Sequence, residues 1–324
     1  MNNLFSTPIA FLIFKRPEET DRVFQVIRKI KPETLLIVAD GPRNPEEKEL
    51  CEKVRRVVEN IDWPCEVLKN YSETNLGCKK RISSGLDWVF QNVDRAIILE
   101  DDCLPNESFF LFCAELLEKY KDNEKIMHIG GINVQTESKK TIQNDSYYFS
   151  NIAQIWGWAT WKRAWQRYDV NMNDWPKIKA EKKLIDVLKK PILVDYFEYL
   201  FQKMYMSKLT TWDVAWTYTC MKENGLCIVP NKNLIQNIGF GQGATHSIAN
   251  KGYIGEMKLE ALTFPLIHPE KIEVDKTNNE VIYKKVFGIQ TRIGQKILWF
   301  CKSNFPKTYN QLRSFSQNIK LLMK

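Results

Sequence analysis

The chain has 324 residues, of which 44% are hydrophobic, so it has enough apolar side chains for a core and is not intrinsically disordered. No run approaches the about 18 consecutive apolar residues of a transmembrane helix. Nine lysines and arginines follow Glu280 without an acidic residue, and they exceed the net charge of +8. The preceding part is therefore nearly neutral, which argues against nucleic-acid binding there, and the basic end predicts an anionic partner.

The first third of the chain alternates short apolar runs with amphipathic stretches. Apolar runs predict buried strands, and apolar residues at three- and four-residue intervals predict helices. In chain order we expect a strand at Ile9–Phe14, a helix from Pro17, a strand at Leu35–Ala39, a helix at Glu46–Asn60, a strand at Glu66–Lys69, a helix at Cys78–Gln91 and a strand at Arg95–Leu99. This alternation predicts an α/β fold with a mostly parallel sheet flanked by helices.

The second half of the chain is less regular. An aromatic-rich segment begins at Trp156, and a Gly-rich loop is expected at Asn237–Ser247. The other expected elements are a helix at Lys182–Met206 interrupted near Pro191, a helix at Asp213–Asn224 and a strand at Leu226–Val229. From about Ile282 onward the sequence becomes basic and amphipathic.

Three consecutive acids, Glu100, Asp101 and Asp102, directly follow the fourth predicted strand. Ligands of parallel sheets bind beyond the carboxyl ends of the strands. Carboxylates there suit Mg²⁺ or Mn²⁺, which prefer hard oxygen ligands and complete their shells with phosphates and water. The alternative is a solvated acidic turn. Asp40 follows the second strand, where it is either a turn residue or an acceptor for nucleobase and ribose donors.

Three further residues are candidates for a sugar-transfer site. Asp213 opens a predicted helix between Trp212 and Trp216, so it is either a general base beside aromatic walls or only a helix cap. Arg81 lies near the start of the third helix, where a basic side chain suits the phosphates of a donor. His246 in the Gly-rich loop is either a diphosphate or metal contact or a structural residue.

These motifs resemble the GT-A glycosyltransferases. The run Ile97–Phe112 (IILEDDCLPNESFFLF) is similar to their metal-binding strand, most closely to that of the N-acetylglucosaminyltransferase I type. The similarity continues in order through Gly157-Trp158, Trp212-Asp213 and Phe240-Gly241 to His246-Ser247, and it covers roughly residues 6–270.

The resemblance implies a role for most candidate residues. Asp102 is the expected ligand of Mn²⁺ or Mg²⁺, and Asp213 is the expected catalytic base. The resemblance also implies donor binding at Asp40, Glu100, Asp101 and the loop that contains His246. From the residues themselves we add Arg81 as a donor contact and Trp158 and Trp212 as acceptor contacts. The implied domain is a GT-A unit at residues 1–280, with a donor half at about 1–130 and an acceptor half at about 131–280.

The implied function is an inverting, metal-dependent transfer of GlcNAc or another hexose from a nucleotide diphosphate, expected to be UDP, to a glycan or lipid-linked acceptor. One alternative is a sugar nucleotidyltransferase. Such enzymes need a Gly-rich loop after the first strand, where this chain has Lys15-Arg16-Pro17-Glu18. The other alternative is a catalytically inactive glycan-binding scaffold.

Residues 281–324 form the basic amphipathic segment. Ile289, Ile293, Ile297 and Phe300 fall on one face of a predicted helix. A basic amphipathic helix binds anionic membranes, and no secretory signal begins the chain. We therefore expect a cytoplasmic protein, peripheral on the inner face of the cell membrane. The alternative is that this face packs on the catalytic domain or on a second subunit in a homo-oligomer.

Overall fold

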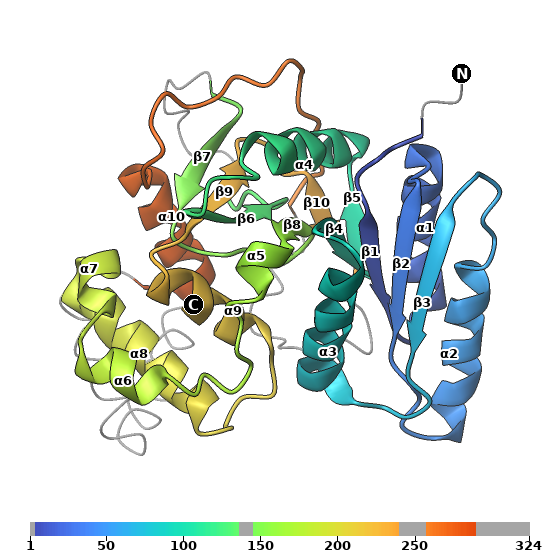
Figure 1. Ribbon diagram of the computed structural model, residues 1–324, viewed down its shortest axis with the longest axis horizontal. Coiled ribbons are helices and arrows are strands. Elements are labelled where there is room, and N and C mark those ends of the chain that lie inside the picture. Colours follow the sequence, from blue (N-terminus) through green and yellow to red (C-terminus); the bar gives the residue numbers. More distant parts are fainter. Residues whose placement is uncertain (1–3, 136–144, 240–256, 290–324) are drawn as a thin grey trace, which may run out of the picture.

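The computed structural model describes residues 4–135, 145–239 and 257–289. His246 and the segment 290–324 lie outside the described residues, so the expectations for them remain predictions. The described chain contains an eight-stranded sheet in the order β3-β2-β1-β4-β8-β6-β9-β7 and a two-stranded sheet of β10 and β5 (Figure 1).

The N-terminal half is the parallel part of the large sheet. Strands β3, β2, β1 and β4 all run parallel. The elements are β1 Ile9–Ile13, α1 Pro17–Ile30, β2 Thr34–Ala39, α2 Pro45–Val57, β3 Glu66–Tyr71, α3 Gly77–Asn92 and β4 Arg95–Glu100. The seven elements expected from periodicity are therefore confirmed, with ends shifted by a few residues. The strand order reverses between β1 and β4, and a crevice for a ligand is expected at such a point.

The C-terminal half extends the sheet in mixed directions. Strands β8 and β7 run antiparallel to their neighbours, while β6 and β9 are parallel to each other. The strands are β5 Cys103–Pro105, β6 Ile126–Gly130, β7 Tyr147–Ser150, β8 Trp158–Trp161, β9 Leu226–Pro230 and β10 Ile235–Asn237. The helices are α4 Glu107–Lys119, α5 Lys162–Trp165, α6 Trp175–Ala180, α7 Leu184–Leu188, α8 Pro191–Tyr205, α9 Asp213–Lys222 and α10 Lys276–Phe287. The mostly parallel α/β architecture is confirmed in the described residues.

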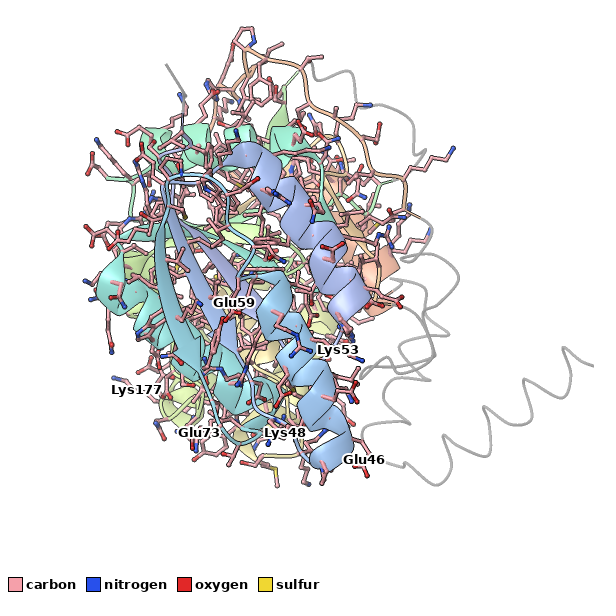
Figure 2. All side chains as sticks on the ribbon, turned by 90° about the vertical axis from the view of Figure 1, so that its right-hand side faces the viewer. Glu46, Lys48, Lys53, Glu59, Glu73 and Lys177 are labelled. Atoms are coloured by element: carbon pink, nitrogen blue, oxygen red, sulfur yellow. The ribbon has the colours of Figure 1, made fainter. Side chains whose placement is uncertain are left out.

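Alternate side chains of each central strand enter two separate cores. Phe11 of β1 packs on the face covered by α1, α2 and α4, whereas Leu12 packs on the face covered by α3. Both faces are buried because successive side chains of a strand point to opposite sides. Helix α2 shows the complementary pattern: it buries Cys51 and Val54 and leaves charged residues on its outer surface (Figure 2).

A cluster of aromatic rings fills the core beside α9. Trp158 stacks on His128 and on Trp212, with ring centroids 5.1 Å and 5.6 Å apart. The Nε1–H of Trp216 donates to Nδ1 of His128 at 3.2 Å, and Nε2 of His128 lies 3.0 Å from the carbonyl oxygen of Gln154. This arrangement requires a neutral imidazole with its proton on Nε2. Burial lowers the pKa of His128 to about 3.

Acid is expected to destabilise the fold through His128. Its folded pKa is below the unfolded value of about 6.5, so its contribution is full above that pH and is lost as the pH falls toward 3. Between pH 7 and pH 5 the wild type should lose about 2 kcal/mol more unfolding free energy than His128→Gln, whose amide can donate and accept but does not titrate. Urea denaturation at both pH values measures the difference. Parallel losses in the two proteins would contradict it.

Helix α10 docks through buried amides. Nδ2 of Asn279 and the hydroxyl of Tyr283 both donate to Oδ1 of Asn151, at 2.7 Å and 2.6 Å. The helix ends at Gly288, which has a φ of 65°, and Ile289 then packs partly buried against the core. The expected boundary at residues 280 and 281 therefore falls inside α10. No helix in the described ranges is long and apolar enough to cross a membrane.

Candidate active site

A cavity of about 540 Å³ lies beyond the carboxyl ends of β1 and β4. It is lined by seven of the residues that the sequence singles out: Asp40, Arg81, Glu100, Asp101, Asp102, Trp212 and Asp213. These residues come from β2, α3, β4 and the start of α9, so the fold gathers segments that are more than half the chain apart. Trp158 is not among the lining residues. It lies behind Trp212 in the aromatic core, with 1% of its surface exposed.

The acidic turn after β4 is bound to the loop that follows β1. Oδ2 of Asp101 accepts from the backbone N–H of Phe14 at 2.9 Å. Nη1 of Arg16 lies 3.2 Å from Oδ1 of Asp101 and 2.6 Å from Oδ2 of Asp102. Asp101 is buried, so its carboxylate fixes the turn, whereas Asp102 keeps 14% of its side chain exposed toward the cavity. The sequence did not reveal Arg16 as a partner of these acids.

Glu100 has a different environment from its neighbours. Within the described residues, no group donates a hydrogen bond to its carboxylate and none forms an ion pair with it. Burial, together with the negative charges of Asp102, Asp101 and Asp213, raises the pKa of Glu100 well above its usual range. A cation near this carboxylate would favour its ionised form, because opposite charge stabilises a buried carboxylate.

The last described residues before position 240 lie against the acidic turn. The N–H of Ile238 donates to the carbonyl oxygen of Asp102 at 2.8 Å, which continues the pairing of β10 with β5. A Cβ atom added at Gly239 would lie 2.4 Å from Oδ2 of Asp102. The absence of a side chain at Gly239 therefore lets this segment pack directly on the carboxylate.

Gly239→Ala is expected to displace the Asp102 carboxylate and to lower metal-dependent nucleotide affinity about tenfold, a usual size for a change that reorients a metal ligand. Calorimetric titration of UDP with Mn²⁺ measures the effect. Gly130→Ala is the matched control, because an added Cβ there meets its neighbours at 3.4–3.5 Å, which is ordinary contact. Equal affinity in the two variants would show that Gly239 does not position Asp102.

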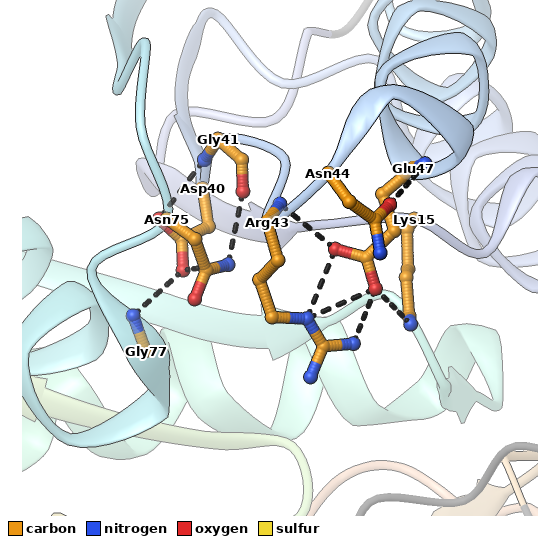
Figure 3. Close-up of polar contacts among 8 residues, drawn as sticks. All are labelled: Lys15, Asp40, Gly41, Arg43, Asn44, Glu47, Asn75 and Gly77. Atoms are coloured by element: carbon orange, nitrogen blue, oxygen red, sulfur yellow. Dashed lines mark hydrogen bonds and ion pairs between the residues drawn. The ribbon is translucent and has the colours of Figure 1, made fainter.

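Asp40 holds the loop that leads into α3. Its Oδ1 accepts from the N–H groups of Gly41 and Leu76, both at 2.9 Å. Its Oδ2 accepts from Gly77 N–H and Asn75 Nδ2, both at 3.1 Å, and Figure 3 draws the contacts with Gly41, Asn75 and Gly77. Each carboxylate oxygen therefore already has two donors. The carboxylate thereby shapes the cavity wall and satisfies amide groups at the N-terminus of α3.

Arg81 carries positive charge into the same wall. Its Nη2 donates to the backbone and side-chain oxygens of Asn70 at 2.7 Å and 2.6 Å, whereas its buried Nε has no partner in the described chain. No carboxylate forms an ion pair with Arg81 within the described ranges. Burial accordingly lowers the pKa of Arg81. The charge of Asp40 opposes this shift only in part, so a buried guanidinium that forms no ion pair favours an anionic ligand in the cavity.

Two further basic residues, Lys15 and Arg43, also line the cavity. The carboxylate of Glu47 in α2 accepts hydrogen bonds from Nζ of Lys15 at 2.6 Å and from the backbone N–H of Arg43 at 3.0 Å. It also forms an ion pair with the Arg43 guanidinium (Figure 3). The two cations also lie over the ring of Phe14 at 5.6 Å and 5.7 Å. The sequence analysis missed these residues, because only the fold brings the loop after β1 next to the start of α2.

Asp213 is the first residue of α9 and lines the cavity together with Thr211, whose hydroxyl donates to its carboxylate. Trp212 is 98% buried but still lines the cavity, and the half-buried Trp156 lines it as well. The structure therefore adds Trp156 to the aromatic residues at the cavity. In the sequence, only the position of Trp156 at the start of the aromatic-rich segment indicated that it could belong to the site.

No protein-family model and no curated protein matches the chain. Among solved structures, it is similar to a 4-diphosphocytidyl-2C-methyl-D-erythritol synthase from Anaerococcus prevotii, with 12% identity, 48% of this chain and 71% of the other covered, and a TM-score of 0.31. It is also similar to a UDP-glucose pyrophosphorylase complexed with UDP-glucose, with 11% identity, coverage of 45% and 62%, and a TM-score of 0.26.

A third similar structure is TarS 1–349 from S. aureus, with 9% identity, 71% of this chain and 59% of the other covered, and a TM-score of 0.38. The chain thus spans less than two thirds of the second and third of these structures. With TM-scores below 0.5, the three similarities carry no argument about activity, which has to be argued from the cavity itself.

Proposed function

We propose that the chain is a metal-dependent glycosyltransferase that takes a sugar from a nucleotide diphosphate. One observation carries the proposal: a single cavity, placed where the strand order reverses, is lined by the acidic turn Glu100–Asp102 and by Asp213. A carboxylate group for a cation and a separate carboxylate for proton transfer are what an inverting sugar transfer requires. The resemblance of the sequence to GT-A enzymes supports the same assignment.

Asp102 and Glu100 would hold the cation. Both offer hard oxygen ligands of the kind that Mn²⁺ and Mg²⁺ prefer. In the part of the chain that the structure describes, no group of three or more His, Cys, Asp and Glu side chains is arranged to hold a metal ion. The two carboxylates therefore suit a cation whose shell is completed by water and the donor's phosphates. When bound, the cation would stabilise the charge of the departing diphosphate.

Asp213 would act as the general base. It would take the proton from an acceptor hydroxyl, whose oxygen forms a bond to the anomeric carbon while the bond from that carbon to the diphosphate oxygen breaks. The attack from the opposite face inverts the anomeric centre. The hydrogen bond from Thr211 keeps the Asp213 carboxylate oriented, because a donor fixes one of its two oxygens and leaves the other for the acceptor.

The remaining cavity residues would bind the two substrates. Arg81 would contact the diphosphate or ribose of a donor that we expect to be UDP-GlcNAc or another UDP-hexose, with Asp40 shaping the wall beside it. His246 stays a proposed donor contact outside the described residues. Trp212, supported from behind by Trp158, would contact a glycan or lipid-linked acceptor.

A panel of nucleotide sugars tests the proposal with Mn²⁺ present. The expected products are a nucleoside diphosphate and either free sugar or an extended acceptor. Formation of a nucleoside triphosphate from pyrophosphate and a nucleotide sugar would instead identify a nucleotidyltransferase. Binding without turnover of any donor would indicate a glycan-binding scaffold.

The basic segment would bring the enzyme to its acceptor at the inner face of the cell membrane. In flotation with vesicles of increasing anionic content, the full chain is expected to float with the vesicles, whereas a truncated form without the basic segment is expected to stay unbound. Because α10 is docked up to Phe287 and Ile289 packs on the core, the truncation should end after Ile289. Equal recovery of both forms would show that the segment is not a membrane anchor, and sedimentation of the full chain would then test a homo-oligomer.

A further inference from the structure

Arg16 is the cation that faces the acidic turn. Its Nη1 bridges Asp101 and Asp102, and its side chain is 24% exposed at the wall of the cavity. Four carboxylates of the cavity interact electrostatically here: Glu100, Asp101, Asp102 and Asp213. Burial and the charge of Asp102 raise the pKa of both Glu100 and Asp101, and the charge of Arg16 opposes both shifts. In the described residues no other basic side chain forms an ion pair with this turn. Arg16 therefore neutralises part of a strongly acidic corner.

The backbone of Arg16 is fixed, while its side chain extends to Asp101 and Asp102 in the cavity wall. Its carbonyl oxygen accepts from the N–H of Thr20 at 2.9 Å and from the Thr20 hydroxyl at 2.6 Å, and Pro17 then begins α1. A long flexible side chain on a fixed base can exchange one anionic partner for another without moving the fold. Asp101 would keep its bond from the Phe14 amide after such an exchange.

Arg16 occupies an oxygen that a divalent cation would use. Its Nη1 lies 2.6 Å from Oδ2 of Asp102, which is too close for a cation to share that oxygen without strong repulsion between like charges. The guanidinium fork also matches the geometry of phosphate oxygens. When a cation binds Asp102, Arg16 loses this ion pair. The diphosphate that binds together with the cation can then form an ion pair with Arg16.

We propose that Arg16 is the internal counter-ion of the acidic turn: it competes with the divalent cation for Asp102 and transfers to the diphosphate of the donor when the cation binds. This inference rests on the donor class of the proposed function. It makes Arg16 a positioning residue whose removal has opposite effects on the two ligands, because the cation loses a competitor and the diphosphate loses a contact.

Binding of Mn²⁺ alone tests the first half. Electron paramagnetic resonance of free Mn²⁺ is recorded with wild type, Arg16→Gln, Arg16→Lys and the control Arg22→Gln, which changes an exposed arginine of α1, the helix that follows Arg16. We expect Arg16→Gln to bind Mn²⁺ about tenfold more tightly than wild type, since a repelling charge is removed. Arg16→Lys should fall between them, and Arg22→Gln should match wild type. Thermal unfolding checks that each variant is folded.

Binding of inorganic pyrophosphate at saturating Mn²⁺ tests the second half. Here Arg16→Gln should bind about tenfold more weakly than wild type, in the opposite direction to its effect on Mn²⁺. Equal Mn²⁺ affinity in wild type and Arg16→Gln, including no binding by either, overturns the inference, as does a loss of both affinities. The proposed function is tested separately by donor turnover in the wild type, so it can stand or fail without this result.

Discussion

Replacing Asp213 by asparagine is expected to lower turnover by about two to four orders of magnitude, the usual contribution of a general base, and to leave donor affinity close to wild type. Asparagine has the same shape and can still accept the hydrogen bond from Thr211, but it cannot take a proton. Loss of turnover in this variant would therefore reflect chemistry and not a change in folding. Single-turnover assays with saturating donor measure it.

Asp195→Asn is the matched control for this prediction. It makes the same substitution at an exposed residue of α8 away from the cavity, and wild-type turnover is expected. If Asp213→Asn retains more than about a tenth of wild-type turnover, Asp213 is not the base. In that case its hydrogen bond with Thr211 would have only a structural role at the start of α9.

Asp102→Ala is expected to abolish the metal-dependent part of UDP binding, a loss of about two orders of magnitude in affinity, because cation stabilisation of phosphate charge is worth several kcal/mol. Calorimetric titration of UDP with and without Mn²⁺ gives the two affinities. Asp102 is partly exposed, and the bonds that fix the turn belong mainly to Asp101. The fold should therefore survive the change, with thermal unfolding close to wild type.

Asp122→Ala controls for the loss of one negative charge at an exposed position after α4. UDP affinity in this variant should keep its full response to Mn²⁺. An unchanged response in Asp102→Ala would remove Asp102 from the metal site and leave Glu100 as the remaining candidate.

The parallel half of the fold was predictable because strands β1, β2 and β4 are mainly apolar and the helices between the strands carry regular apolar stripes. Strands β5, β7 and β10 were not recognised, since each has only three or four residues and too short a pattern. Strand β6 was missed for another reason. Its buried sequence Ile126–Gly130 includes His128, whose polar ring is accommodated only by partners distant in the sequence.

The acidic part of the site was predictable because the carboxyl ends of parallel strands lie at the same edge of a sheet. Acids at the ends of β2 and β4 must meet at one edge, and the structure confirms that Asp40 and Asp102 line one cavity. Arg16 was not predictable, because a basic residue before a helix-starting proline has no local signature. Trp158 could not be separated from Trp156 by sequence. Trp158 is the first residue of β8, whose four residues are all buried, whereas Trp156 lies before that strand and is half-buried.

The aromatic cluster beside α9 also gives the protein an optical property. Five of the six pairs among the rings of Trp158, Trp165, Trp212 and Trp216 have centroids 5.3–6.5 Å apart, close enough for excitation to migrate among them before emission. Trp212 is the member of this group that also borders the cavity. A nucleotide bound in the cavity is expected to change the local field at this ring and, by energy transfer, the emission of the whole cluster. The intrinsic fluorescence of the unlabelled chain is therefore expected to report on the occupancy of its cavity.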